Sequence, residues 1–305
     1  MRVRLLGTSA GGGFPQWNCN CVNCRGLRAG SLAARPRSQS CVAISADGRR
    51  WFLLNASPDI RTQLEGFAPL LPGESVRSTG VEAVLLTNAD LDHTLGLLVL
   101  REGERLPVHA TAAVREALVE GLQLGPVLES YCGIEWRTPP GELQPLRHRD
   151  GTPSGLSYAA FPVAGKPPRY REGRVAPSPE DNVGYLLHDN ATSGRLVYMP
   201  TAARLGAAIL GRLRRSDLLL LDGTFWSADE MIARGVGRHT AAEMGHLPVG
   251  GPDGSLALLR STTVARTVYV HMNNTNPMLS EDSPEWQRVH EAGAAIGWDG
   301  MEFEV

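Results

Sequence analysis

The sequence has no excess of basic residues. In its 305 residues, 30 lysines and arginines face 32 aspartates and glutamates, which gives a formal net charge of -2. Binding to a nucleic-acid backbone requires basic side chains that neutralise phosphates, so we expect no nucleic-acid partner. Long apolar runs are also missing. The aliphatic stretches 95–100 and 218–221 fall far short of the roughly 20 residues of a membrane helix, so we expect no membrane association.

Cysteine is scarce and unevenly placed. There are five cysteines, an odd number, and three of them lie between positions 19 and 24. Residues 1–7 enter strand-like sequence directly, without the apolar core and cleavage site of a signal peptide. These features predict a cytoplasmic protein without a disulfide framework. With 42% hydrophobic residues the chain can bury a large core, and we interpret residues 1–305 as one domain.

Short apolar runs alternate with helical patterns along the chain. The runs predict ten strands, several of them apolar enough to be buried on both faces: 2–6, 42–45, 51–55, 83–87, 107–110, 156–161, 184–188, 196–199, 218–222 and 267–271. Residues 138–182 are rich in Pro, Gly and Arg, and we interpret them as long loops around one strand. The mixture of strands and helices indicates a layered α/β architecture.

Three segments carry helix signals. In 111–123, apolar residues recur at every fourth position and form one stripe. We expect a second helix over 203–214, with Thr201 as its N-cap. A third begins at Pro284, after Ser283 as N-cap.

Cys19, Cys21 and Cys24 are the sharpest local signal. Three thiolates within six residues can surround one tetrahedral zinc ion, and the glycines at 11–13 indicate that they lie on a loop. We therefore predict a structural zinc, and its fourth ligand stays open between Cys41, Cys132, a histidine and an amide. Two alternatives are unrelated surface thiols and a redox relay. The relay is disfavoured because Cys-x-Cys is a poor disulfide and no helix start that would activate a thiol is evident.

A second polar cluster follows the expected strand 83–87. Asp90, Asp92 and His93 lie on the turn between that strand and a predicted helix, where α/β sheets commonly hold ligands. Two carboxylates and an imidazole packed together need a cation or water to satisfy them. A helix N-cap with an acidic first turn is the alternative; it explains both aspartates but not His93. His271 ends another strand and is a candidate partner of this cluster.

Further polar residues are candidate substrate contacts. Asp222 ends the run 218–222 and is a candidate substrate or supporting contact. His239 and His246 lie on a Gly-punctuated stretch and either bind substrate carboxylates or face solvent, with His246 the stronger candidate. The arginines at 169, 171 and 174 are interpreted as solvated charges, with an anionic substrate as the alternative.

The segment 87–96 resembles the H-x-H-x-D-H segment of the metallo-β-lactamase superfamily. Together with 7–24 and 269–277, it gives the chain a resemblance over essentially its whole length to the PqqB family, which acts in pyrroloquinoline quinone (PQQ) biosynthesis. The resemblance implies an α/β fold, classed as α+β in some schemes: a four-layer αββα sandwich. It places the metal site at the edge between the two sheets.

The departures from the superfamily motif are informative. Asn88 and Asp90 stand where two histidines hold the first metal, and neither the usual histidine near 163–166 nor the usual aspartate near 200–201 is present. What the resemblance leaves is the second-metal set of Asp92, His93 and His271. A dinuclear hydrolase needs both metals, whereas two histidines and one carboxylate are the ligand set of Fe(II) oxygenases.

The resemblance therefore implies an iron-dependent oxygenase that hydroxylates the tyrosine ring of a Glu–Tyr crosslinked PQQ precursor. Asp90 would serve in catalysis as a further iron ligand or hydrogen-bond partner, and Asn88 would contact iron or substrate. The alternatives are a carrier that binds PQQ or its precursor and assists its transport to the periplasm, and a metal-dependent hydrolase. Analogy with cyclic phosphodiesterases of the superfamily places Asn274 as the fourth zinc ligand. The native metal and the oligomeric state stay open, with a homodimer as one option.

Overall fold

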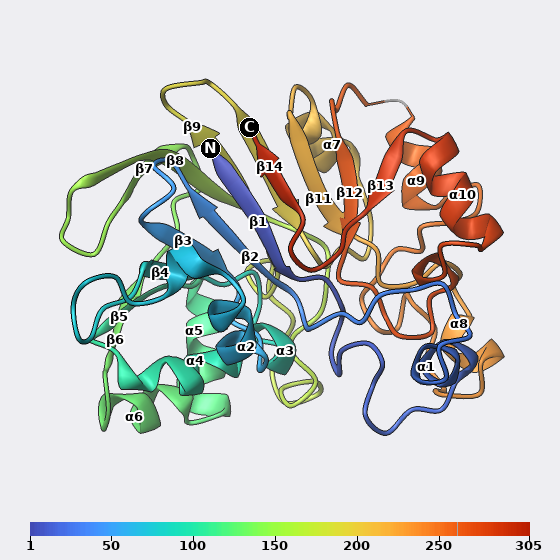
Figure 1. The fold of residues 1–305 in the computed structure, drawn as a ribbon, viewed down its shortest axis with the longest axis horizontal. Coiled ribbons are helices and arrows are strands. Elements are labelled where there is room, and N and C mark those ends of the chain that lie inside the picture. The colour runs from blue at the N-terminus through green and yellow to red at the C-terminus, as the bar shows by residue number, and fades with distance from the viewer. Residues whose placement is uncertain (261) are drawn as a thin grey trace.

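The computed structural model describes residues 1–260 and 262–305, and its strands form two mixed sheets (Figure 1). The first sheet contains, in spatial order, β14 (Glu302–Glu304), β1 (Arg2–Gly7), β2 (Cys41–Ser45), β3 (Trp51–Leu54), β4 (Val81–Leu85), β5 (Leu106–His109) and β6 (Ile134–Arg137). The second contains β13 (Ala294–Ile296), β12 (Thr267–Val270), β11 (Leu218–Asp222), β10 (Arg195–Met199), β9 (Val183–Asp189), β8 (Pro153–Pro162) and β7 (Gln144–Arg147).

Each sheet has an antiparallel part and a parallel part. In the first, β14, β1, β2 and β3 pair antiparallel, and β3 to β6 pair parallel. In the second, β7 to β10 pair antiparallel, and β10 to β13 pair parallel. Parallel strands end at the same sheet edge, so β10, β11 and β12 deliver their following residues to one place.

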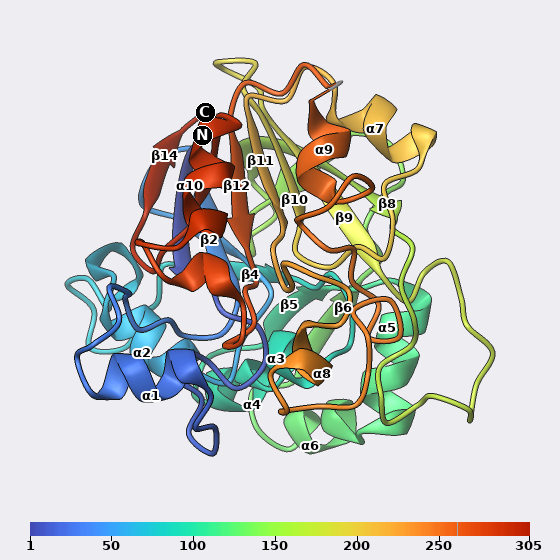
Figure 2. The same ribbon diagram turned by 90° about the vertical axis from the view of Figure 1, so that its right-hand side faces the viewer.

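The two sheets pack face to face, and helices cover their outer faces (Figures 1 and 2). The leucine run of β11 shows why the strands are so apolar. Leu218 and Leu220 lie in the core between the sheets, whereas Leu219 and Leu221 face the helices on the outside. Strands buried on both faces need apolar residues at every position. This arrangement confirms the expected αββα sandwich.

Helices form the two outer layers. On the first sheet lie α2 (Ile60–Glu65), α4 (Gly96–Val99), α5 (Ala112–Glu116) and α6 (Leu124–Glu129); on the second lie α7 (Ala207–Leu213), α9 (Ser255–Leu259) and α10 (Pro284–Glu291). The helices α1 (Val22–Arg28), α3 (Leu91–Thr94) and α8 (Glu230–Ala233) belong to the loops at the sheet edge. No helix within residues 1–260 and 262–305 has the length and apolar character needed to cross a membrane.

All ten expected strands are present, with ends that move by up to three residues. Four short strands, β6, β7, β13 and β14, were not expected, and the segment 138–182 holds β7 as well as β8. Each has only three or four residues and too few apolar positions to show a clear pattern.

The helix expected over 203–214 begins later than expected, at Ala207 after Gly206, so Thr201 is not its N-cap. The backbone N–H of Ala202 donates to Asp222, and that of Ala203 donates to Ala164. These contacts with other loops replace the first helical turns.

The other two predicted helices begin where the sequence indicated. Thr111 and Ser283 both cap their helices through the side chain. The segment expected as one helix over 111–123 divides into α5 and a π-helical turn, η3 (Ala117–Gly121).

Candidate metal centres

His93 lies in α3, directly after β4 and a short turn, and its side chain is completely buried. Its Nδ1 lies 2.8 Å from Asn88 Oδ1 and 3.3 Å from Thr87 Oγ1. An amide oxygen only accepts, so Nδ1 carries the proton and Nε2 carries the lone pair. Nε2 is buried and has no hydrogen-bond partner among the described residues. A buried, unpaired imidazole nitrogen is the atom that a metal ion satisfies.

Gly96 fixes the position of this turn. Its N–H donates to Ala56 O, and the N–H of Ala56 donates to His93 O at 2.7 Å. A side chain at residue 96 would place its Cβ 2.3 Å from Ser57 O. Glycine is therefore required where α4 packs against the loop after β3, and this contact holds the backbone of His93.

His271 follows β12 and adopts a left-handed backbone conformation with φ of 59°. Such a conformation is uncommon outside glycine and often marks a functional site. Thr224 holds it: Thr224 Oγ1 lies 2.7 Å from His271 Nδ1 and 2.6 Å from Asp222 Oδ1. Because the hydroxyl donates its single proton to the carboxylate, it accepts from Nδ1–H. Nε2 of His271 then points to Asp92 Oδ2, 3.1 Å away.

Asp92, His93 and His271 converge from the two sheets. Asp92 Oδ2 lies 3.8 Å from His93 Nε2, and the ligand atoms of all three residues lie within 4.8 Å of one another. In both histidines the supporting contact uses Nδ1 and leaves Nε2 for the cluster, as in metal-binding histidines generally. The donor set and the unpaired Nε2 of His93 fit one metal ion.

The electrostatics agree with this fit. Burial lowers the pKa of His93 to about 4, so the imidazole is neutral, as a ligand must be. Burial opposes ionisation of Asp92, but the two histidines outweigh burial and hold the pKa of Asp92 far below its usual range. Burial opposes protonation of His271, but the hydrogen bond to Asp92 and the charge of Asp92 outweigh burial and raise the pKa of His271, so a bound metal ion would replace a proton at this ligand.

Asp90 lies beside this cluster and lines the same cavity. Burial and the neighbouring charge of Asp92 raise the pKa of Asp90 to about 6. Asp90 occupies the N-cap position of α3, yet its side chain caps no helical N–H and accepts instead from Asn88 Nδ2 at 2.8 Å. Side-chain capping therefore does not explain Asp90.

A second group of possible ligands adjoins the first. Asp222 Oδ2 lies 2.8 Å from His246 Nδ1, and these two residues with His271 also bring three ligand atoms within 4.8 Å. The rings of His246 and His271 stack with centroids 5.5 Å apart. His271 therefore belongs to both groups.

A cavity of about 460 Å³ opens onto the metal cluster. Among the residues expected to act there, the structure places Asp90, Asp92, His271, His246 and His239 on its wall. His239 is exposed at the rim. Asn88 and Asp222 do not line the cavity and lie behind His93 and His246, which they contact.

Two basic residues of the long loop region also line this cavity. Lys166 pairs with Glu172 at 2.6 Å, and Arg169 is exposed. Arg171 instead pairs with Glu116, outside the set of lining residues.

The three clustered cysteines meet one side chain of the His271 loop. Asn274 Nδ2 lies 3.1 Å from Cys19 Sγ, 3.5 Å from Cys21 Sγ and 3.3 Å from Cys24 Sγ. The oxygen and nitrogen of an amide can be exchanged by rotation, so the Asn274 oxygen can occupy the same place. Burial raises the pKa of Cys24 to about 11, and a cation would allow this thiol to ionise.

The cysteine cluster does not lie entirely on a loop. Cys21 is the N-cap of α1 and Cys24 lies in its first turn, so a helix start is present where none was expected. This helix could not be predicted from the sequence, because the helix has only seven residues and lacks a Ser, Thr, Asp or Asn cap. Burial opposes ionisation of Cys21, but hydrogen bonds from the Cys24 backbone and from the neighbouring thiols lower its pKa. The lack of a helix start therefore no longer argues against thiol reactivity.

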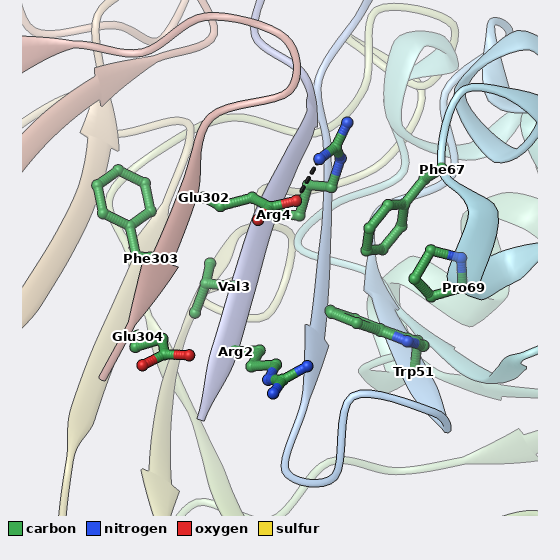
Figure 3. Close-up of a pocket in the computed structure, with 9 residues that line it drawn as sticks. All are labelled: Arg2, Val3, Arg4, Trp51, Phe67, Pro69, Glu302, Phe303 and Glu304. Atoms are coloured by element: carbon green, nitrogen blue, oxygen red, sulfur yellow. Dashed lines mark hydrogen bonds and ion pairs between the residues drawn. The ribbon is translucent and has the colours of Figure 1, made fainter.

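A separate cavity of about 400 Å³ lies over β1 and β14 (Figure 3). Arg4 and Glu302 form an ion pair across it, beside Trp51 and Phe67. It shares no lining residue with the cavity at the metal cluster, and no histidine or cysteine lines it. None of the three groups of possible metal ligands among the described residues lies there.

Several residues that support the site could not be predicted from the sequence. Asn55, Thr87, Thr201 and Thr224 follow the strands β3, β4, β10 and β11, and each lies at or near the site. Their shared signal was the one used for His271 and Asp222: a polar residue at the end of a buried strand or within two residues after it. Small uncharged residues at strand ends are too common to single out without the fold.

Comparisons with known proteins agree with this architecture. A model of the Beta-lactamase superfamily domain matches residues 50–272. "Coenzyme PQQ synthesis protein B" of Pseudomonas savastanoi pv. phaseolicola is 46% identical, and that of Pseudomonas putida (strain GB-1) is 44% identical, each with full coverage of both chains. The crystal structure of Zn(2+)-bound PqqB from Methylobacterium extorquens matches with a TM-score of 0.91 and 38% identity over all of both chains. A diphosphatase of the PhnP family, 20% identical with a TM-score of 0.69, shares the fold.

Proposed function

The chain belongs to the PqqB family of the β-lactamase superfamily, and from this premise we propose that it acts in PQQ biosynthesis as an iron-dependent oxygenase. The proposed reaction hydroxylates the tyrosine ring of a Glu–Tyr crosslinked precursor. The observation that carries the proposal is the convergence of Asp92, His93 and His271 on one point at the wall of a cavity.

The ligand set favours one metal. Two imidazoles and one carboxylate with open positions suit Fe(II) and O₂ chemistry. The usual ligands of the first metal in a dinuclear hydrolase are replaced here: Asn88 contacts His93, Asp90 accepts from Asn88, and Thr201 stands near the position of the bridging carboxylate. Hydrolysis that needs two metals is therefore disfavoured.

Bound Fe(II) would supply the activation of O₂ that ring hydroxylation requires. The balance of the reaction is simple: one oxygen atom enters the ring as a hydroxyl group, and the other leaves as water. An external reductant supplies the two electrons, and two protons from the reductant or solvent complete the water molecule.

The protein itself would contribute orientation and exclusion of water. Asn88 and Thr224 hold the two histidine rings through Nδ1, and Asp222 accepts from the Thr224 hydroxyl. His93 is fully buried and His271 is 4% exposed, so water reaches the cluster mainly through the cavity. In this proposal Asp90 is a further hydrogen-bonding or ligand group, and His239 and His246 contact the substrate.

For the thiolate cluster we propose a structural zinc held by Cys19, Cys21, Cys24 and Asn274. The support is the approach of one amide group to all three sulfur atoms. Four ligands around sulfur-bound zinc close the coordination sphere, which is typical of a structural site.

The test is an oxidation assay with the Glu–Tyr crosslinked precursor, Fe(II), a reductant and O₂, followed by mass spectrometry. We expect the substrate to gain one oxygen atom per hydroxylation. The His93→Gln variant should lose this activity, and His290→Gln, an exposed change on α10, should keep it. An unchanged substrate would refute the oxygenase. Tight binding of PQQ or its precursor without turnover would point to the carrier function instead.

A further inference from the structure

The same cavity carries Thr201, a polar group that the proposed function leaves unused, and His246, for which the proposed function names no bonding partner on the substrate. Thr201 follows β10 and lines the cavity; it is 8% exposed, and its Oγ1 has no hydrogen-bond partner among the described residues. His246 lines the cavity beside it and uses only Nδ1, in the contact with Asp222. A buried hydroxyl without a partner is destabilising unless something binds it.

Hydrogen bonds fix Thr201 and His246 relative to each other. Asp222 Oδ2 accepts from the backbone N–H of Ala202 at 2.9 Å and lies 2.8 Å from His246 Nδ1. The backbone N–H of Leu247 donates to Ala202 O at 2.7 Å. One carboxylate and one backbone contact thus connect the loop after β10 to the loop that carries His246.

The contact with Asp222 also determines the hydrogen-bonding character of His246. Both carboxylate oxygens of Asp222 accept from backbone N–H groups, Oδ2 from Ala202 at 2.9 Å and Oδ1 from Thr224 at 3.0 Å. A carboxylate that accepts these hydrogen bonds also accepts from His246 Nδ1–H, and in this tautomer of the imidazole Nε2 carries the lone pair. Phe225, edge-on at 5.7 Å, and His271, stacked at 5.5 Å, hold the ring between them.

We propose that Thr201 and His246 form a two-point binding site for a hydroxyl group on an aromatic ring. A hydroxyl donates and accepts at once, so it can donate to His246 Nε2 and accept from Thr201 Oγ1. A carboxylate or phosphate would leave Nε2 unpaired and would face Asp90 and Asp92. Phe225 and Met244 on the same wall offer apolar contact for the ring.

This inference rests on the proposed function in one respect, because the hydroxyl group is assigned to the phenol of the substrate. The site would orient that ring beside the ligands Asp92 and His271, which line the same cavity. Thr201 and His246 contact the substrate in this proposal, and Asp222 is a positioning residue that acts through His246.

The test measures the binding of 4-nitrocatechol to zinc-loaded protein from its absorbance change, without any turnover. Thr201→Val keeps the side-chain shape and removes the hydroxyl, and His246→Asn removes the Nε2 acceptor. Each should weaken probe binding about 5- to 30-fold, the effect of leaving one buried polar group unpaired. Thr62→Val on the exposed face of α2 and His188→Asn on β9 are matched controls and should bind as the parent protein does.

Zinc content is measured on every variant. Weaker probe binding with full active-site zinc supports the proposal, whether or not the oxidation assay succeeds. Parent-like probe binding by Thr201→Val and His246→Asn would overturn it. Loss of active-site zinc from His246→Asn would overturn it too, because His246 would then be a metal ligand. A failed oxidation assay with intact probe binding would reject the oxygenase and leave this binding site standing.

Discussion

At the scale of single residues, the site depends on which nitrogen of each histidine is occupied by protein contacts. Asn88 engages His93 at Nδ1, Thr224 engages His271 at Nδ1, and Asp222 engages His246 at Nδ1. In each case Nε2 is left for a metal or a substrate. Supporting contacts of this kind typically change metal affinity by 10- to 100-fold when removed.

His109 is also a buried histidine with a hydrogen-bond partner at Nδ1, but it belongs to none of the groups of possible metal ligands in the described part of the chain. It lies on β5, and its Nδ1 is 2.8 Å from the hydroxyl of Tyr158 on β8 of the other sheet. His109 is 3% exposed, and burial lowers its pKa to about 3. This histidine therefore stays neutral in the folded protein at pH values where the unfolded chain takes up a proton.

The consequence is a pH-dependent stability. As the pH falls below about 6.5, the usual pKa of histidine, the unfolded state gains a proton at His109 that the folded state does not, until pH approaches 3. His109 alone should lower the free energy of unfolding by about 1.4 kcal/mol per pH unit well inside this window. His109→Asn removes the titrating group, so its free energy of unfolding should fall less steeply between pH 6 and pH 4.5. Urea unfolding at a series of pH values measures both slopes, and equal slopes would refute this assignment.

At the scale of elements, the loop after β12 connects the two candidate metal centres. It begins with His271 at the cavity and reaches Asn274 at the cysteines three residues later. Asn276 Nδ2 donates to Gly223 O at 2.8 Å, next to Thr224 and its contact with His271. A change at the cysteines is therefore expected to reach the backbone of His271.

Removing Asn274 tests this connection. Asn274→Ala should weaken zinc binding at the cysteines, and the freed loop should weaken active-site metal binding by about 10-fold or more. Metal titration with separate chelator competition for the two sites measures both effects. Asn190→Ala, an exposed change in the turn after β9, is the matched control. Unchanged active-site affinity after loss of the zinc would show that the two centres are independent.

The sequence predicted those elements whose positions depend on the local pattern of apolar residues. Buried strands such as β11 are apolar on both faces, so their positions were visible, and with them the strand-end residues Asp92, His271 and Asp222. The start of α1 was not visible because its N-cap is a cysteine. The start of α7 was misplaced because tertiary hydrogen bonds hold Ala202 and Ala203 outside the helix.

At the scale of the whole molecule, the site exists only because the two sheets meet at one edge. The first sheet supplies Asp92 and His93 after β4, and the second supplies His271 after β12. The connection between the loops that carry Thr201 and His246 was not visible in the sequence, because it depends on parallel strand order and on the contacts of Asp222 and Ala202. The resemblance to the superfamily motif indicated the candidate ligands, whereas the hydrogen bonds that orient them are visible only in the structure.

The most direct test of the central claim is metal analysis of protein purified without oxygen and titrated with Fe(II), using mass spectrometry for zinc and iron. We predict one zinc and one iron per chain. Asp92→Asn and His93→Gln should lose the iron and retain the zinc at the cysteines. Two active-site metals per chain, or iron retained by both variants, would contradict a mononuclear centre built from Asp92, His93 and His271.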